Sequence, residues 1–261
     1  MFFNDAPIYV VPNLFSYQHV LLLFIGAGYV VGLSLLMRRV KPKTQDRIYL
    51  AVCAVMVTLF FGRLFLGYDN IFQDTFWNAD KDWTTLAPLQ LCNLLIYFCP
   101  VVVILKKKRL YNTLYYFALA PLTALLIFPP VHMNLNLFAE YMFFDYFIIH
   151  INIMAIAISL PVSGRFVPSL KAAAFNWVYF LAAGLFIFII TAILRNFDHF
   201  RTASYFWTFG PAGLPVLTQL YAFFGELPFI YLLPVAIIIL ALNLLMWLPF
   251  LKKRDRKARL K

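Results

Sequence analysis

Seven polar or reactive side chains interrupt stretches of this chain that are otherwise apolar. A thiol can act as a nucleophile, a carboxyl group or an imidazole can transfer protons, and amide or guanidinium groups can hold a polar ligand. Ionisable groups are costly in apolar surroundings, so by default they indicate a functional site or a buried pair. The seven side chains are Arg63, Gln90, Cys92, Asn93, Asp145, His150 and Asn152.

Simpler explanations exist for each of these side chains. A single cysteine in an apolar helix is usually an inert core residue, which is how we interpret Cys53 and Cys99. A lone histidine often makes a polar contact between helices, and an arginine near a helix end can extend to lipid headgroups. The four histidines show no HxxxH or HExxH spacing and the cysteines form no CxxC pattern, so we predict no metal site.

The composition indicates a membrane protein. The chain of 261 residues is 63% hydrophobic and 13% charged, with a mean hydropathy of +0.81, whereas soluble domains carry about 25% charged residues. The net charge of +11 does not indicate nucleic-acid binding, because most basic residues form short clusters beside apolar runs. We therefore predict one polytopic helical membrane domain over residues 1–251 and a basic cytoplasmic tail over 252–261. We expect neither a nucleic-acid nor a soluble partner.

Apolar runs long enough to cross a bilayer predict an all-α integral membrane protein with about seven transmembrane helices. The predicted ranges are 18–37, 48–67, 86–105, 110–128, 141–161, 172–194 and 228–251. The segment 195–227 combines glycines and prolines with many aromatic residues, which is compatible with either a re-entrant or an interfacial hairpin.

The basic residues predict the orientation through the positive-inside rule. Eighteen of the 22 Lys and Arg residues fall on one side, in the connections after the first, third and fifth helices and in the tail. Only Lys81, Arg195 and Arg201 fall on the other side, and Arg63 lies inside a helix. The N-terminus is therefore expected outside and the C-terminus in the cytoplasm. We interpret the tail as an anchor on anionic lipid headgroups.

Three predicted helices place reactive groups at a similar depth below the outer surface. At about 1.5 Å per residue, Cys92 would lie roughly 9 Å and His150 roughly 13 Å below the outer ends of their helices. Arg63 would lie about one turn below the outer end of its helix. We therefore expect the second, third and fifth helices to adjoin around a cavity open to the outer leaflet. The other four polar side chains fall in the same layer.

Four sequence motifs resemble a known family. They are LAPLQLCNLLIYF (86–98), LYYFALAPLTALLIFP (114–129), FFDYFIIHINIM (143–154) and FGELPFIYLL (224–233). Over most of the chain they resemble the YwaF-type bacterial membrane proteins, which form one superfamily with the eukaryotic transmembrane protein 164 acyltransferases. The resemblance implies a multi-pass protein of a bacterial cell membrane that acts on phospholipids.

The resemblance also implies that a cysteine in the third-helix motif and a histidine in the YFIIH motif carry acyl transfer. His150 matches that histidine. Two registers remain open for the cysteine, because PLQLC has Gln90 where bacterial members have histidine, and the eukaryotic pattern reads P-C-H. Alignment on the proline puts Leu89 at the position of the nucleophile, whereas the spacing to His150 puts Cys92 there.

On this resemblance we expect a phospholipid acyltransferase, or a phospholipid acyl hydrolase, that needs no cofactor. Cys92 would attack the ester of an outer-leaflet lipid with His150 as base, and Arg63 would hold the phosphate. The remaining polar groups would bind the substrate or its oxyanion. They are Gln90, Asn93, Asp145 and Asn152. The alternative is a non-enzymatic lipid-binding or transport protein whose polar pocket holds a headgroup.

Overall fold

The structure is a computed structural model that describes residues 17–66, 89–118, 141–201, 203–210 and 215–251. All regular elements in these ranges are helical, which confirms the prediction of an all-α protein. The α-helices are α1 (Tyr17–Arg39), α2 (Pro42–Leu66), α3 (Leu91–Leu105), α4 (Lys108–Phe117), α6 (Tyr141–Val162), α7 (Leu170–Leu194), α8 (Pro215–Phe223) and α9 (Leu233–Trp247). The short 3-10 helices are η2 (Asp198–Phe200), η3 (Tyr205–Trp207), η4 (Ile230–Leu232) and η5 (Leu248–Phe250).

Four helical segments of the described chain are long and apolar enough to cross a membrane: His19–Arg39, Pro42–Gly62, Leu170–Leu194 and Ile230–Phe250. Two shorter apolar helices, Leu91–Leu105 and Tyr146–Val162, accompany them. Together they match six of the seven predicted spans. The remaining prediction, 110–128, extends beyond the described residues, although α4 covers its beginning. The chain is an integral membrane protein, while the number of spans and their orientation stay predictions.

The chain divides into two compact units. Unit 1 contains Met1–Gln73 and Leu95–Val167, and unit 2 contains Asp74–Leu94 and Pro168–Lys261. Helix α3 begins in unit 2 and continues into unit 1. The prediction of a single membrane domain over 1–251 stays a prediction.

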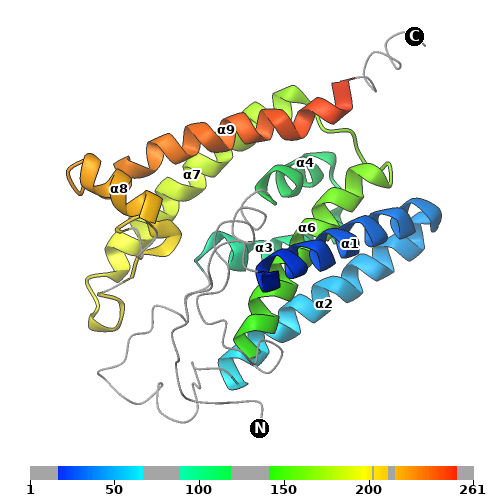
Figure 1. Cartoon of the computed structure of the whole chain (residues 1–261), viewed down its shortest axis with the longest axis horizontal. Coiled ribbons are helices and arrows are strands. Elements are labelled where there is room, and N and C mark those ends of the chain that lie inside the picture. Colours follow the sequence, from blue (N-terminus) through cyan, green and yellow to red (C-terminus); the bar gives the residue numbers. More distant parts are fainter. Residues whose placement is uncertain (1–16, 67–88, 119–140, 202, 211–214, 252–261) are drawn as a thin grey trace. The chain divides into compact units, whose positions relative to one another are not determined.

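In unit 1, α6 packs against both α1 and α2, and Figure 1 shows these three helices side by side. Gly26 permits the close approach of α1, because a Cβ at this position would collide with Cδ1 of Ile151. The second half of α6 is largely buried and includes two alanines, Ala155 and Ala157, whose small side chains suit close helix packing in a membrane. Helix α2 also contacts α3 through the rings of Phe60 and Tyr97, whose centroids are 5.8 Å apart.

In unit 2, α7 and α9 pack along each other. Trp177 Nε1 donates a hydrogen bond of 2.7 Å to the carbonyl oxygen of Ala236, which joins the two helices. Nearer the C-terminal end of α7, Phe188 stacks on Phe209 and also contacts Phe229. The opposite face of α7 exposes large apolar side chains, as expected for a helix surface that contacts lipid.

Candidate functional site

The geometry of His150 defines which ring nitrogen can act as a base. His150 lies on α6 and is buried, with 7% of its surface exposed. Its Nδ1 lies 2.6 Å from the carbonyl oxygen of Tyr146, four residues earlier on the same helix face. A carbonyl oxygen only accepts hydrogen bonds, so Nδ1 must carry the proton in the neutral ring, and the lone pair lies on Nε2.

The ring of Tyr146 also restricts the orientation of His150. The two ring centroids are 4.2 Å apart, with the planes inclined by 34°. Among the described residues, no hydrogen-bond partner engages Nε2. The imidazole is therefore held at one nitrogen and remains able to accept a proton at the other.

Asn152 joins two helices. Its Oδ1 accepts a hydrogen bond of 2.6 Å from the hydroxyl of Tyr29 on α1, and only 5% of its surface is exposed. Asn152 follows His150 by two residues, so its side chain points about 160° away around the helix. The predicted role of Asn152 in substrate binding stays a prediction, and the described contact favours a packing role.

Cys92 is the second residue of α3 and is half-buried. The first helical hydrogen bond of α3 runs from the backbone nitrogen of Leu94 to the carbonyl oxygen of Gln90, at 3.0 Å. The backbone N–H groups of residues 91–93 therefore have no carbonyl partner within the helix. N–H groups of this kind attract negative charge to the start of a helix. The side chain of Asn93, in the same turn, is also half-buried.

Gln90 connects the start of α3 to a loop that sequence reasoning did not associate with it. Its Oε1 accepts a hydrogen bond of 3.0 Å from the backbone nitrogen of Phe206. Phe206 belongs to the segment 203–210, called here the 203–210 loop, and has a left-handed backbone with φ of 57°. That conformation is unfavourable for a bulky residue and persists only where surrounding contacts enforce it.

Contacts from both sides enforce this loop conformation. Within the loop, Ser204 Oγ donates to the carbonyl oxygen of Gly210 and accepts from the nitrogen of Phe209. From outside it, the nitrogen of Phe229 donates to the carbonyl oxygen of Thr208 at 2.7 Å, and the hydroxyl of Tyr231 donates to the carbonyl oxygen of Trp207. The predicted contribution of Gln90 to an oxyanion site stays a prediction, while its described contact is with this loop.

Two predicted site residues have side chains outside the described part of the structure. Arg63 lies in the last turn of α2, and Asp145 lies near the start of α6. Leu89, the alternative position for the nucleophile, precedes α3 and is half-buried. Within the described residues, no group of three or more His, Cys, Asp or Glu side chains could hold a metal ion.

The structure groups the predicted site residues into two sets. Gln90, Cys92 and Asn93 lie in unit 2, whereas His150 and Asn152 lie in unit 1. The two sets are described within their own units, so the pairing of Cys92 with His150 stays a prediction.

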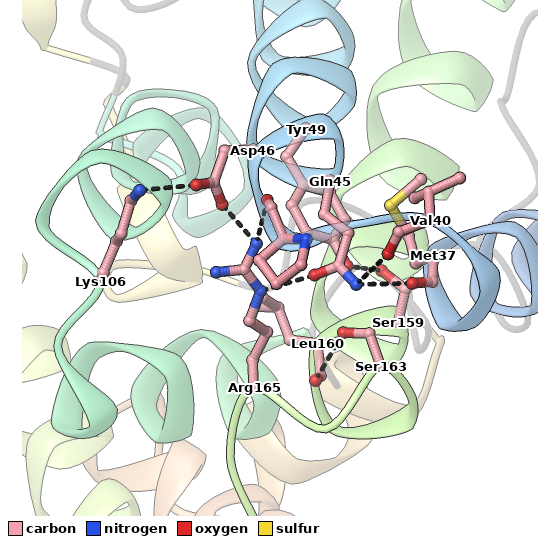
Figure 2. Close-up of polar contacts among 11 residues, drawn as sticks. Met37, Val40, Gln45, Asp46, Tyr49, Lys106, Ser159, Leu160, Ser163 and Arg165 are labelled. Carbon is pink, nitrogen blue, oxygen red and sulfur yellow. Dashed lines mark hydrogen bonds and ion pairs between the residues drawn. The ribbon is translucent and has the colours of Figure 1, made fainter.

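Sequence reasoning missed a cluster of polar residues at the ends of the helices in unit 1. This Asp46 cluster consists of Gln45, Asp46, Lys106 and Arg165, and Figure 2 shows Asp46 between the two basic side chains. The two oxygens of Asp46 accept from Lys106 Nζ at 2.5 Å and from Arg165 NH2 at 2.6 Å. In the sequence, Lys106 and Arg165 serve only as topology signals.

Gln45 completes this cluster through backbone contacts. Its Oε1 accepts from Arg165 Nε at 2.6 Å, while its Nε2 donates to the carbonyl oxygens of Met37 and Val40. Every polar atom of the buried Gln45 side chain is therefore engaged. The single sequence signal was an acidic residue, Asp46, within a strongly basic connection. Its partners come from connections about 60 and 120 residues away, which no local pattern predicts.

Comparison with known proteins gave one finding. The model of the TMEM164 family matches residues 14–252, which is nearly the whole chain. A search of curated proteins gave no match, and a search of solved structures gave none.

Proposed function

The chain belongs to the TMEM164 family, and we propose that this membrane protein transfers acyl chains between phospholipids through a Cys92 nucleophile and a His150 base. The observation that carries the proposal is the hydrogen bond from His150 Nδ1 to the carbonyl oxygen of Tyr146. It leaves the Nε2 lone pair as the proton acceptor, which is the arrangement a general base requires.

In the first half of the proposed reaction, His150 Nε2 takes the proton of the Cys92 thiol. The thiolate attacks the carbonyl carbon of a phospholipid ester, and the ester C–O bond breaks. The departing lysophospholipid oxygen receives the proton from His150, and the acyl chain remains as a thioester on Cys92. No oxidant, reductant or cofactor is needed for this step.

In the second half, a lysophospholipid hydroxyl attacks the thioester while His150 Nε2 takes its proton. The C–S bond breaks, the acyl chain passes to the acceptor, and the thiolate recovers the proton from His150. If water takes the place of the acceptor hydroxyl, the same residues perform hydrolysis. The balance of atoms is therefore the same for a transferase and a hydrolase, and the acceptor decides the outcome.

The start of α3 supports a role in stabilising the negative charge of the tetrahedral intermediate. Backbone N–H groups without helical partners occur at residues 91–93, next to the proposed nucleophile. Donors of this kind that are fixed before the reaction contribute a large part of catalysis in acyl transfer. The half-buried side-chain amide of Asn93 supplies a further N–H donor there.

The test uses the purified full-length chain in lipid nanodiscs with a phospholipid that carries a radiolabelled acyl chain. We expect a protein-bound label that hydroxylamine releases, because hydroxylamine cleaves thioesters. Cys92→Ser should abolish this label. Cys99→Ser is the matched control, since Cys99 lies on the same helix and is fully buried. Equal labelling of the Cys92→Ser protein would rule out Cys92 as the nucleophile, and no transfer in any variant would favour the lipid-binding alternative.

A further inference from the structure

Arg195 is a half-buried cation in unit 2 whose hydrogen-bonding capacity is mostly unused. It follows the last residue of α7 as its C-cap. Its NH1 donates a hydrogen bond of 2.8 Å to the carbonyl oxygen of Ala203, and its guanidinium lies 4.9 Å from the centre of the Phe209 ring. A guanidinium carries five N–H donors, and the described contacts use one of them. The remaining donors lie in the plane of the guanidinium, which the Phe209 ring contacts.

The other partly buried arginine of the described chain behaves differently. Arg165 pairs with Asp46, and even the highly exposed Arg201 pairs with Asp198 at 3.0 Å. Among the described residues, Arg195 has no carboxylate partner, and its neighbours are a carbonyl oxygen and an aromatic ring. A partly buried charge without a counter-charge is costly, so an anion bound from outside would stabilise this arrangement.

Offsetting the dipole of its own helix does not account for the described side-chain contact of Arg195. A basic residue at a helix C-terminus can offset the helix dipole by bonding to the last carbonyl groups. The described side-chain bond of Arg195 goes instead to the loop, eight residues further along the chain.

The 203–210 loop connects Arg195 to the start of α3. Ala203 accepts from Arg195, and Phe206, three residues later, donates to Gln90. Gln90 precedes Cys92 by two residues, and all of these residues belong to unit 2. In the predicted topology, Arg195 is also one of only three basic residues outside the helices on the outer side. The Arg195 guanidinium and the start of α3, which carries the Cys92 thiol, therefore both contact the 203–210 loop.

We propose that Arg195 binds the phosphate group of a phospholipid headgroup. The planar guanidinium forms paired hydrogen bonds to two phosphate oxygens, a geometry that arginine favours over lysine. The ring of Phe209 beside the guanidinium, which itself stacks on Phe188, suits an amphipathic ligand better than a fully solvated anion. The assignment rests on the proposed function for one point only, namely that the bound lipid is the one whose ester reacts at Cys92.

The first test follows chemical modification of arginine in the wild-type protein. Delipidated protein in dodecyl maltoside is treated with phenylglyoxal, and the modified arginines are quantified by peptide mass spectrometry. We expect dioleoylphosphatidylcholine to slow modification of Arg195 by about tenfold, while dioleoylglycerol, which lacks the phosphate, has no effect. Arg201 is the internal control, because its side chain is 76% exposed and its modification rate should not change.

Three outcomes of this test would overturn the inference. The first is an Arg195 modification rate that does not change with phospholipid. The second is equal protection by dioleoylglycerol, which would show that burial by acyl chains and not phosphate binding is responsible. The third is equal protection by sodium phosphate alone at the same concentration, which would assign the site to a free anion.

The second test uses variants in a Cys92→Ser background, where no turnover consumes the lipid. Arg195→Gln should lower the preference for phosphatidylcholine over diacylglycerol by about tenfold or more, because charge-assisted hydrogen bonds are lost. Arg195→Lys should restore part of the preference, and Arg201→Gln should leave it unchanged. An equal loss in both Gln variants would show a general charge effect and overturn the assignment.

The inference and the proposed function fail independently. Protection of Arg195 without a thioester on Cys92 would leave a lipid-binding site and remove the proposed reaction. A thioester on Cys92 without protection of Arg195 would retain the reaction and remove the inference. If Arg195→Gln does not fold, the wild-type modification experiment still decides.

Discussion

Among the described residues, two arginines are partly buried, and their surroundings are opposite. Arg165 in unit 1 bonds to a carboxylate, an amide and a backbone carbonyl, all supplied by α2 or the residue at its start. Arg195 in unit 2 bonds to one carbonyl oxygen and lies over one aromatic ring. A cation paired with a carboxylate of its own chain contributes to the structure, whereas a partly buried cation without such a partner is stabilised by an anion from outside the chain. Substitutions around Arg165 are therefore expected to lower stability, and substitutions at Arg195 or the reactive residues to lower lipid binding or acyl transfer.

The largest expected effect is on chemistry and concerns His150, of whose two ring nitrogens only Nδ1 has a hydrogen-bond partner among the described residues. His150→Gln keeps a polar side chain of similar size but removes the base. We expect acyl transfer to fall by about 10²–10⁴-fold, the usual contribution of a general base. The thermal midpoint should change little, because no described residue bonds to Nε2. Both quantities can be measured on the same preparation in nanodiscs.

The double variant Cys92→Ser with His150→Gln sharpens this prediction. The effects of substituting residues that act as one unit do not add up. The double variant should therefore be as active as the less active of the two single variants. Multiplicative losses would mean that the two residues act separately, and the paired mechanism would then be wrong.

The Asp46 cluster should show the reverse pattern, a loss of stability without a loss of acyl transfer. Asp46→Ala leaves Arg165 and Lys106 without their carboxylate. Breaking a fully buried pair costs about 3–5 kcal/mol, and we expect about 2 kcal/mol or more here because Asp46 is 17% exposed. The measurement is the thermal midpoint followed by tryptophan fluorescence. Transfer per folded molecule should remain, because α6 ends at Val162, about 18 Å along its axis from His150, and Arg165 lies beyond that end.

Lys106→Gln is the matched control for Asp46→Ala. Lys106 is 53% exposed, and exposed ion pairs contribute only about 0–1 kcal/mol. A larger loss in Lys106→Gln than in Asp46→Ala would contradict the assignment of Arg165 as the main partner of Asp46.

A smaller and more local effect is expected at Gln90. Gln90→Leu removes the acceptor for the nitrogen of Phe206, and an unsatisfied buried group costs about 1–3 kcal/mol. We expect faster hydrogen exchange in peptides covering the 203–210 loop, measured by mass spectrometry. Gln90→Glu keeps an oxygen acceptor and should preserve the protection. Unchanged exchange in Gln90→Leu would mean that the other loop contacts suffice.

Local sequence patterns predicted the apolar helices well, because length and hydropathy alone decide whether a segment spans a bilayer. The observed α1, α2, α6 and α7 begin and end within about six residues of the predicted ranges. The same patterns also singled out His150 and Cys92, since ionisable and nucleophilic groups are unusual in apolar helices.

Patterns could not predict contacts between distant segments. The bond from Phe206 to Gln90 spans 116 residues, and that from Arg165 to Asp46 spans 119. The left-handed backbone of Phe206 runs against its own preference and follows from tertiary bonds, so no local rule indicates it. For the same reason Arg195 was counted as a topology signal before its contacts were known.

The smallest effect is expected for the basic tail. Unlike Arg165 and Arg195, its charged residues are assigned neither to a packing contact nor to a binding site. Lys252→Gln, Lys253→Gln and Arg254→Gln together remove three of the eighteen basic residues on the predicted cytoplasmic side, which leaves fifteen against three. Orientation depends on this asymmetry, so topology should persist, and acyl transfer by the inserted protein should stay within about twofold of wild type. Accessibility labelling of the tail and the transfer assay test the two parts. A large loss of transfer with correct insertion would place the tail among the residues that act on the substrate.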